Sequence, residues 1–264
     1  DYEMDHGWRQ QWIAMHFGNH LDINDAGYLA RASTNYLHWQ VSRRFTQLPD
    51  DSRYSSTDWR WRVSSNHNNR GDRLNDQLRV SREGQLRNGA YEYAQVNING
   101  PGISDLLLRG HGIVRLPASF NAFYEFERPR KGRWAHEVEA ELFGGGLAGN
   151  ERIGGALWYG ATYFVNDAFS LDAGVALVRR PDWLIWQGAD SGDLVGAFEG
   201  TEAKLLAGLD WSIDPRQELR VKLQAIGIDA RARRAWRFDA AGHAIAAADT
   251  VEDFGVRNLA FQIR

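Results

Sequence analysis

Apolar and charged residues alternate along one segment of this chain after another. In residues 58–63 tryptophan and valine alternate with aspartate and arginine, and in residues 202–211 alanine, leucine and tryptophan fill every second position. Because successive side chains on a strand point to opposite sides, each segment predicts a strand with one apolar and one charged face. A transmembrane barrel requires this pattern, since lipid lies outside it and water inside. The alternation predicts an all-β, antiparallel transmembrane β-barrel of the outer-membrane type.

Composition narrows the classes of protein that remain. All-β folds of 264 residues are often one domain, so we expect a single β-barrel domain over residues 1–264. The 31 basic and 34 acidic residues, with a net charge of -3, lack the basic excess of a dedicated nucleic-acid-binding protein. With no cysteine, the chain has neither disulfides nor thiolate metal sites. A mean hydropathy of -0.51 is compatible with a barrel, whose lipid-facing residues occupy only alternate positions.

Aromatic and β-branched runs separated by turn-forming residues predict thirteen strands. They are expected near 8–17, 33–45, 56–65, 74–83, 90–98, 105–116, 119–128, 134–143, 154–165, 168–178, 201–212, 217–229 and 256–264. Short turns are expected at Pro117-Ala118, Asn166-Asp167 and Asp214-Pro215-Arg216, and long loops over 180–200 and 231–254. One inconsistency remains, because three strands between the turns at Pro117 and Asn166 place those turns at opposite rims. A bend or bulge at the glycines of 144–146 is the simplest explanation.

Three segments carry a resemblance to a known family. They are HLDINDAGYLAR at 20–31, QELRVKLQAIGI at 217–228 and DFGVRNLAFQIR at 253–264. They resemble signatures of a poorly characterised family of bacterial outer-membrane proteins, in which an N-terminal module similar to family 9 carbohydrate-binding domains precedes a C-terminal β-barrel. The resemblance implies that nearly all of this chain corresponds to the barrel. It also implies that the barrel is incomplete at the C-terminus and that the sugar-binding module is absent, and it transfers no catalytic residue.

The alternation assigns side chains to the two faces of the expected barrel. Lipid-facing residues are expected to be Trp59, Trp61, Val63, Leu205, Leu209, Leu219, Val221 and Leu223. Residues lining the lumen are expected to be Arg60, Arg62, Glu137, Glu139, Glu141, Lys204, Arg220 and Lys222. Many of the eleven tryptophans lie near strand ends, which is typical of the aromatic belts at membrane interfaces.

The glutamates at 137, 139 and 141 share one strand face, and Glu125 and Glu127 are candidates to face them from the neighbouring strand. Paired carboxylates are what glycoside hydrolysis needs, whereas a row of them is also typical of a solvated lumen wall. We favour the wall.

Other patterns that carry chemistry are weak. Asp22, Asn24 and Asp25 have the spacing of calcium ligands, but an EF-hand would require glutamate at the position of Ser33. The eight histidines form no metal-binding motif, and no nucleophile or phosphate-binding motif occurs. We therefore expect no metal, no cofactor and no enzymatic activity.

Trp183 and Trp186 are the one specific candidate for ligand binding, because they lie in the expected loop 180–200. Exposed tryptophan can stack on a sugar ring, and the alternative is that this loop folds into the barrel mouth as a plug.

The sequence thus favours a non-catalytic, channel-like or scaffold portion of a carbohydrate-associated, porin-like transport protein in the bacterial outer membrane. Its expected partners are the lipid bilayer, a small solute or glycan, the barrel-insertion machinery and other envelope proteins, with no nucleic acid.

Two alternative functions stay open. One is a soluble β-sandwich or β-propeller enzyme that acts on polysaccharide through the glutamate row. The other is a structural subunit of a multi-protein envelope assembly.

Overall fold

The structure is a computed structural model that describes residues 2–19, 21, 31–147, 149–188, 190 and 192–264. Its strands are β1 (Tyr2–Glu3), β2 (Trp8–Phe17), β3 (Thr34–Phe45), β4 (Tyr54–His67), β5 (Arg73–Leu86), β6 (Tyr91–Asn99), β7 (Gly102–Ser104), β8 (Val114–Leu116), β9 (Ser119–Lys131), β10 (Trp134–Gly145), β11 (Arg152–Phe164), β12 (Phe169–Trp186), β13 (Val195–Asp214), β14 (Gln217–Phe238), β15 (Ala244–Ala247) and β16 (Phe254–Ile263). The described part also contains a short 3-10 turn, η1 (Asp5–Gly7). Among these residues no helix is long and apolar enough to cross a membrane.

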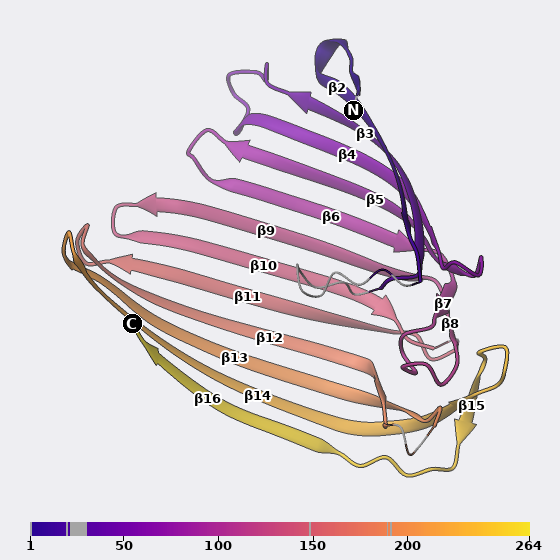
Figure 1. Ribbon diagram of the computed structural model, residues 1–264. Helices are drawn as coiled ribbons and strands as arrows, with labels where there is room; N and C mark the ends of the chain where they lie inside the picture. The colour runs from indigo at the N-terminus through magenta and orange to yellow at the C-terminus, as the bar shows by residue number, and fades with distance from the viewer. Residues whose placement is uncertain (1, 20, 22–30, 148, 189, 191) are drawn as a thin grey trace.

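One antiparallel sheet of fourteen strands makes up most of the molecule (Figure 1). Its strands follow the order of the chain from β1 to β6 and then from β9 to β15, while β16 pairs with β14 beside β15. Strands β7 and β8 form a separate two-stranded sheet. The expectation of an all-β antiparallel fold is confirmed.

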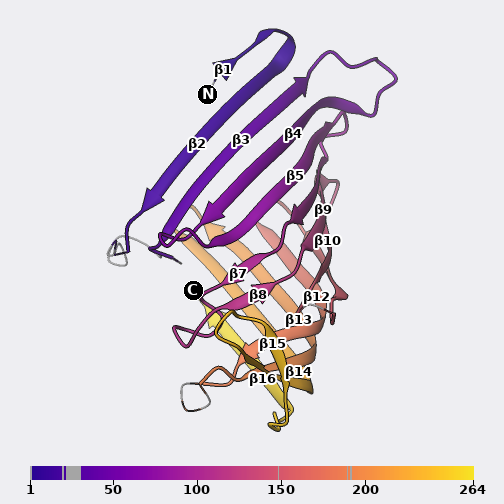
Figure 2. The same cartoon turned by 90° about the vertical axis from the view of Figure 1, so that its right-hand side faces the viewer.

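The sheet curves into an open arc and does not close (Figure 2). Within the described residues, pairing ends on one side at β1 and β2 and on the other at β16, and no ladder joins these two edges. A closed or nearly closed barrel was expected from the sequence, and the described strands form an open sheet instead. Closure requires a set number of strands at a matching tilt and stagger, and alternation within a strand does not report that number.

The connections between strands differ at the two ends of the sheet. At one end, which we call the short-turn end, neighbouring strands are joined by residues 46–53, 87–90, 132–133, 165–168 and 215–216. At the other end, the long-connection end, the connections are residues 18–33, 68–72, 100–118, 146–151, 187–194 and 239–253, the last of which contains β15. Short connections at one end and longer ones at the other were expected, and the strands follow this arrangement except that residues 46–53 form a longer connection than residues 68–72 or 146–151.

The structure resolves the inconsistency in the number of strands, and it shows that one expected strand is wrong. Residues 105–116 were expected to be a strand, but only β8 and a series of turns occur there. Pro117-Ala118 therefore leads from β8 into β9 and does not join neighbours in the large sheet. The bend or bulge expected at the glycines of 144–146 is wrong, because β10 runs in register to Gly145 and ends there, and β9, β10 and β11 are all strands. The apolar residues of 105–116, which led to the expectation of a strand, pack apart from the large sheet's ladders instead.

The two expected long loops are largely strand. Strand β12 extends through Trp186, β13 begins at Val195 and β14 extends through Phe238. Proline 181 and the nearby charges suggested a loop, but the ladder accommodates them through register shifts, one of them between Arg180 and Trp183. The connection between β12 and β13 is thus only residues 187–194.

Residues 100–118, which contain β7 and β8 and which we call the crossbar, connect β6 to its neighbour β9 and also contact residues of strands that are far apart in the sheet. Near its start, a Cβ on Gly102 would lie only 2.0 Å from the carbonyl oxygen of Leu74 at the beginning of β5. Near its end, the backbone of Arg115 donates to the carbonyl of Gly242, beyond β14. Figure 2 shows β7 and β8 inside the arc of the large sheet. The crossbar therefore spans the arc at the long-connection end.

The main cluster of buried apolar side chains lies at this same end. It consists of Leu108, Val114, Leu147, Val195, Ala197 and Trp236. The cluster joins the crossbar and the connection after β10 to the ends of β13 and β14. The rest of the large sheet has no second layer packed on it within the described residues. Both of its faces are therefore available for contact with other molecules.

Candidate functional site: a charged concave face

Strand register separates the side chains of the large sheet into an apolar face and a charged face. On the apolar face, Tyr159 pairs with Val175, which pairs with Leu205. One residue along each strand, on the charged face, Trp158 pairs with Ala176, and Ala176 with Lys204. The alternation read from the sequence thus continues from strand to strand.

The charged face is the concave one. A groove of about 730 Å³ at the short-turn end is lined by charged-face side chains from strands β5 to β13, among them Gln85, Tyr91, Glu137, Trp158 and Leu206. Side chains from so many strands can line one groove only on the inside of the curve. The arc in Figure 2 therefore has its charged face inside.

Register places all the residues expected to line the lumen on this concave face. Glu139 pairs with Trp158, which brings it into the row that contains Ala176 and Lys204. The full set is Arg60, Arg62, Glu137, Glu139, Glu141, Lys204, Arg220 and Lys222.

Opposite charges pair across this face. Arg60 donates two hydrogen bonds to Glu83 at 2.7 and 2.9 Å, and Arg180 bonds Glu202 at 3.0 Å. Arg220 approaches Asp210 at 3.3 Å. These partners belong to neighbouring strands, so the ion pairs cross-link the sheet and leave the wall polar.

One part of the concave face is acidic, and we call it the acidic patch: Glu125, Glu127, Glu137 and Glu139. Glu137 lies directly opposite Glu127, and Glu139 opposite Glu125, which confirms that the two strands present their carboxylates to each other. Carboxylate oxygens of Glu125, Glu127 and Glu137 lie within 4.8 Å of one another. Like charges directly opposite each other destabilise a sheet. Ionised carboxylates clustered in this way also create a negative potential, which attracts cations from the surrounding water.

A flat aromatic surface adjoins the acidic patch. The indole of Trp158 lies over Gly174, where an added Cβ would be 2.3 Å from its Cη2 atom. Glycine at this position leaves the space that the ring occupies. Trp158 and Glu137 both line the groove at the short-turn end, and the sequence analysis did not single out this tryptophan as a lining residue.

Trp183 and Trp186, the expected ligand-binding residues, lie on strand β12 and not in a loop. Both line one groove of about 1030 Å³ at the long-connection end. Trp186 stacks on His111 of the crossbar at 5.4 Å, and its Nε1 donates to the carbonyl of Gly192. Trp183 lies 5.9 Å from the ring of Phe254. Both rings thus already contact other residues of this chain, and neither lies in a loop that could fold into a barrel mouth as the expected plug. Ligand binding at these residues stays a prediction.

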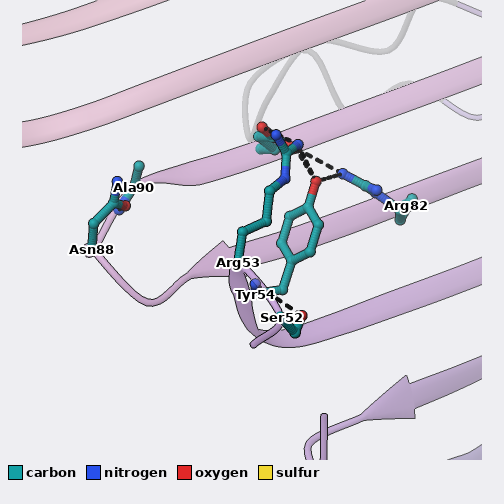
Figure 3. A network of polar contacts seen from close by, with 7 residues as sticks. Ser52, Arg53, Tyr54, Arg82, Asn88 and Ala90 are labelled. Atoms are coloured by element: carbon teal, nitrogen blue, oxygen red, sulfur yellow. Dashed lines mark hydrogen bonds and ion pairs between the residues drawn. The ribbon is translucent and has the colours of Figure 1, made fainter. Parts of the chain in front are cut away.

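The sequence analysis missed a polar cluster on the apolar face, near the short-turn end (Figure 3). Glu92, which is buried, accepts hydrogen bonds from Arg53 at 2.8 Å, from Arg82 at 2.8 Å and from the Tyr54 hydroxyl at 2.6 Å. The ring of Tyr54 covers Gly84, which has no side chain to obstruct it. A signal was present, because Glu92 and Arg82 occur in phase with apolar residues of their strands.

The structure describes little of two features noted in the sequence, the possible calcium ligands and the first family-like segment. The possible calcium ligands Asp22, Asn24 and Asp25 lie outside the described residues, as does most of the family-like segment 20–31. Among the described residues, the one group of three or more potential metal ligands is Glu125, Glu127 and Glu137. Comparison of the chain with family models, curated proteins and solved structures finds no match.

Proposed function

We propose that this chain is part of the wall of a bacterial outer-membrane β-barrel, with its apolar face against lipid and its charged face against water. One observation carries the proposal: large apolar side chains are exposed together on one face of an uncovered sheet. Leu157, Leu177 and Leu205, from three successive strands, are 50%, 53% and 58% exposed. Soluble proteins rarely leave a continuous apolar surface of this size uncovered.

The height of the apolar face fits a membrane. On β11 the apolar-face residues run from Ile153, which is 67% exposed, to Tyr163. Ten residue steps of a strand span about 34 Å, and at the usual barrel tilt of about 40° they cover about 26 Å of membrane thickness. The apolar band of outer-membrane barrels is about 25 Å tall.

The proposal requires partners for the two edges of the sheet. Unpaired backbone N–H and C=O groups are costly in lipid, so spanning strands occur in closed barrels. We therefore propose that further strands complete the barrel between β2 and β16, after delivery by the barrel-insertion machinery. The family resemblance supports the same assignment and the same location, and it adds an association with carbohydrate.

We propose a non-catalytic role in passing or holding a small solute or glycan. The concave face offers side chains of both charges in ion pairs, the acidic patch and the indole of Trp158, which together are typical of a water-filled wall that selects solutes by charge.

Replacing Trp183 and Trp186 by alanine tests whether the groove that they line binds a ligand. Lost glycan binding or altered conductance would give the groove a functional role, and unchanged values would leave it a structural one.

Single-cysteine labelling tests the two faces directly, because the chain contains no cysteine. Leu205→Cys and Lys204→Cys are adjacent on β13 and point to opposite faces. In lipid vesicles we expect the thiol at 205 to react with a lipid-soluble maleimide and to be protected from a charged one. The thiol at 204 should react with the charged reagent. Equal reaction of both thiols with the charged reagent, or a protein that stays soluble without detergent, would overturn the proposal.

The polysaccharide-acting enzyme is the second candidate, because the acidic patch places carboxylates close together on the wall of a groove. A sandwich would cover the apolar face with a second sheet, but the second sheet in the described residues consists of β7 and β8 alone. Hydrolysis of a glycan that disappears in Glu139→Gln with the fold intact would favour the enzyme. Inactivity of the unmodified protein on a broad glycan panel would exclude it.

A further inference from the structure

Arg43 occupies an unusual position on the apolar face. It lies on β3 in phase with Trp39 and Val41, and register places it between Trp8 of β2 and Trp59 of β4. Its guanidinium carbon is 5.0 Å from the centre of the Trp8 ring and 4.5 Å from that of Phe45. Aromatic faces attract such a cation but do not neutralise its charge.

No carboxylate in the described part of the chain pairs with Arg43. Its Nε atom is buried and donates no hydrogen bond to any described residue. Arg82, which lies on the same face and also packs over an aromatic ring, does have a carboxylate partner in Glu92. A cation that is partly removed from water without a counter-charge is costly, so the site lacks an anion.

The position of Arg43 along its strand indicates where that anion comes from. The row of apolar-face residues that contains Arg43 runs Trp8, Arg43, Trp59, Arg82 from β2 to β5. Towards the long-connection end the next rows are mostly apolar, and towards the short-turn end the strands finish. Alternating tryptophan and arginine at the edge of an apolar band is typical of the level at which a bilayer meets water. Lipid phosphates lie at that level.

We propose that Arg43, with Trp8 and Trp59 on either side, binds the phosphate of a lipid head group. The inference rests on the proposed function, because it assumes that the apolar face contacts lipid. Arginine is suited to this ligand, since its planar fork donates two parallel hydrogen bonds to phosphate oxygens. The nearby cluster adds attraction, because Arg53 and Arg82 share the single carboxylate of Glu92.

The test measures lipid retention by native mass spectrometry of the protein in neutral detergent. Phosphatidic acid is compared with a diacylglycerol that has the same acyl chains and lacks only the phosphate. We expect the unmodified protein to retain phosphatidic acid selectively, and Arg43→Gln to weaken that binding about tenfold. Arg43→Lys keeps the charge without the fork and should lose less. Arg44→Gln is the matched control, because it removes the same charge from the opposite face of the same strand.

The possible results separate the inference from the function beneath it. The head-group site would be overturned if the unmodified protein retained the two lipids equally, or if Arg43→Gln and Arg44→Gln had equal effects. In either case, a protein that still associates with detergent would keep the proposed membrane face. Inorganic phosphate that binds as tightly as phosphatidic acid would assign the site to a free anion and overturn the lipid source. A protein that sediments free of detergent micelles would overturn both proposals.

Discussion

Adjacent residues on one strand of this protein experience opposite surroundings. Lys204 lies on the charged face 3.9 Å from Glu202, whereas Leu205 lies on the apolar face and is 58% exposed. The same contrast recurs along β13 and on its neighbours. Single substitutions therefore report on a face, and neighbouring positions serve as controls for each other.

Substituting Leu205 by arginine is expected to destabilise the inserted protein by roughly 2 to 4 kcal/mol, because a charge near the middle of the bilayer must be drawn out of water. Lys204→Gln should be nearly neutral, since the side chain stays against water. Denaturant unfolding of both variants from lipid vesicles measures the difference. Equal destabilisation would contradict the assigned faces.

Glu92 is expected to be the most sensitive polar residue of the apolar face. Its side chain is only 6% exposed and joins Arg82, which is 24% exposed, to Arg53. Glu92→Ala leaves Arg82 partly buried and without its carboxylate, so we expect a loss of about 3 kcal/mol in unfolding free energy. Arg53→Ala removes a 64% exposed partner and should cost clearly less than Glu92→Ala, because water screens an exposed ion pair. A smaller loss in Glu92→Ala than in Arg53→Ala would show that the cluster is not held by Glu92.

At the scale of elements, the long connections are tied to the ends of the strands by charge. Asp193, in the connection before β13, accepts a hydrogen bond from the backbone N–H of Phe238 and pairs with Arg237 at 2.9 Å. Asp249, in the connection after β15, also pairs with Arg237 at 2.9 Å. Both connections are thereby fastened to the last residues of β14.

These contacts predict a dependence on pH. The backbone N–H of Phe238, followed by Arg237, lowers the pKa of Asp193, and Arg237 lowers the pKa of Asp249. A carboxyl whose pKa is lowered by folding stabilises the fold above its unfolded pKa of about 4 and loses that contribution as the pH falls through the folded value. We therefore expect the protection factors of the amides in residues 235–249, which compare exchange with the intrinsic rate at the same pH, to fall below about pH 4.

Two variants check the source of that effect. Asp193→Asn should accelerate exchange in residues 235–249 already at neutral pH and flatten its dependence on acid. Asp190→Asn, an exposed position in the same connection, is the control and should leave both unchanged. Protection factors in residues 235–249 of the unmodified protein that do not change in acid would refute the role of these ion pairs.

At the scale of the whole molecule, the large sheet of the described residues has two open edges. Strand β16 pairs with β14 from Val221 to Ala230 on one side, and its other side has no partner in the described residues. The backbone of β16 therefore presents a free edge within the described residues.

Backbone exchange is expected to show whether the edge is paired in a membrane. In a completed barrel both sets of alternate amides on β16 should be protected, since each would have a strand partner. In an open sheet only the set that faces β14 should be protected. Hydrogen exchange of the vesicle-inserted protein with residue resolution distinguishes the two, and rapid exchange of the outer set would contradict a closed wall.

The sequence by itself determined the local structure of most of the sheet. Twelve of the thirteen expected strands match strands of the large sheet, and the charged and apolar residues of 58–63 and 202–211 lie on opposite faces, because alternation is a property of each strand alone. Tertiary structure decided the rest. The apolar run of the crossbar packs on Val195 and Trp236, far away in the sequence, instead of joining the sheet. The acidic patch, the Glu92 cluster and the open edges likewise depend on which strands are neighbours and on how many there are, and period alone does not contain that information.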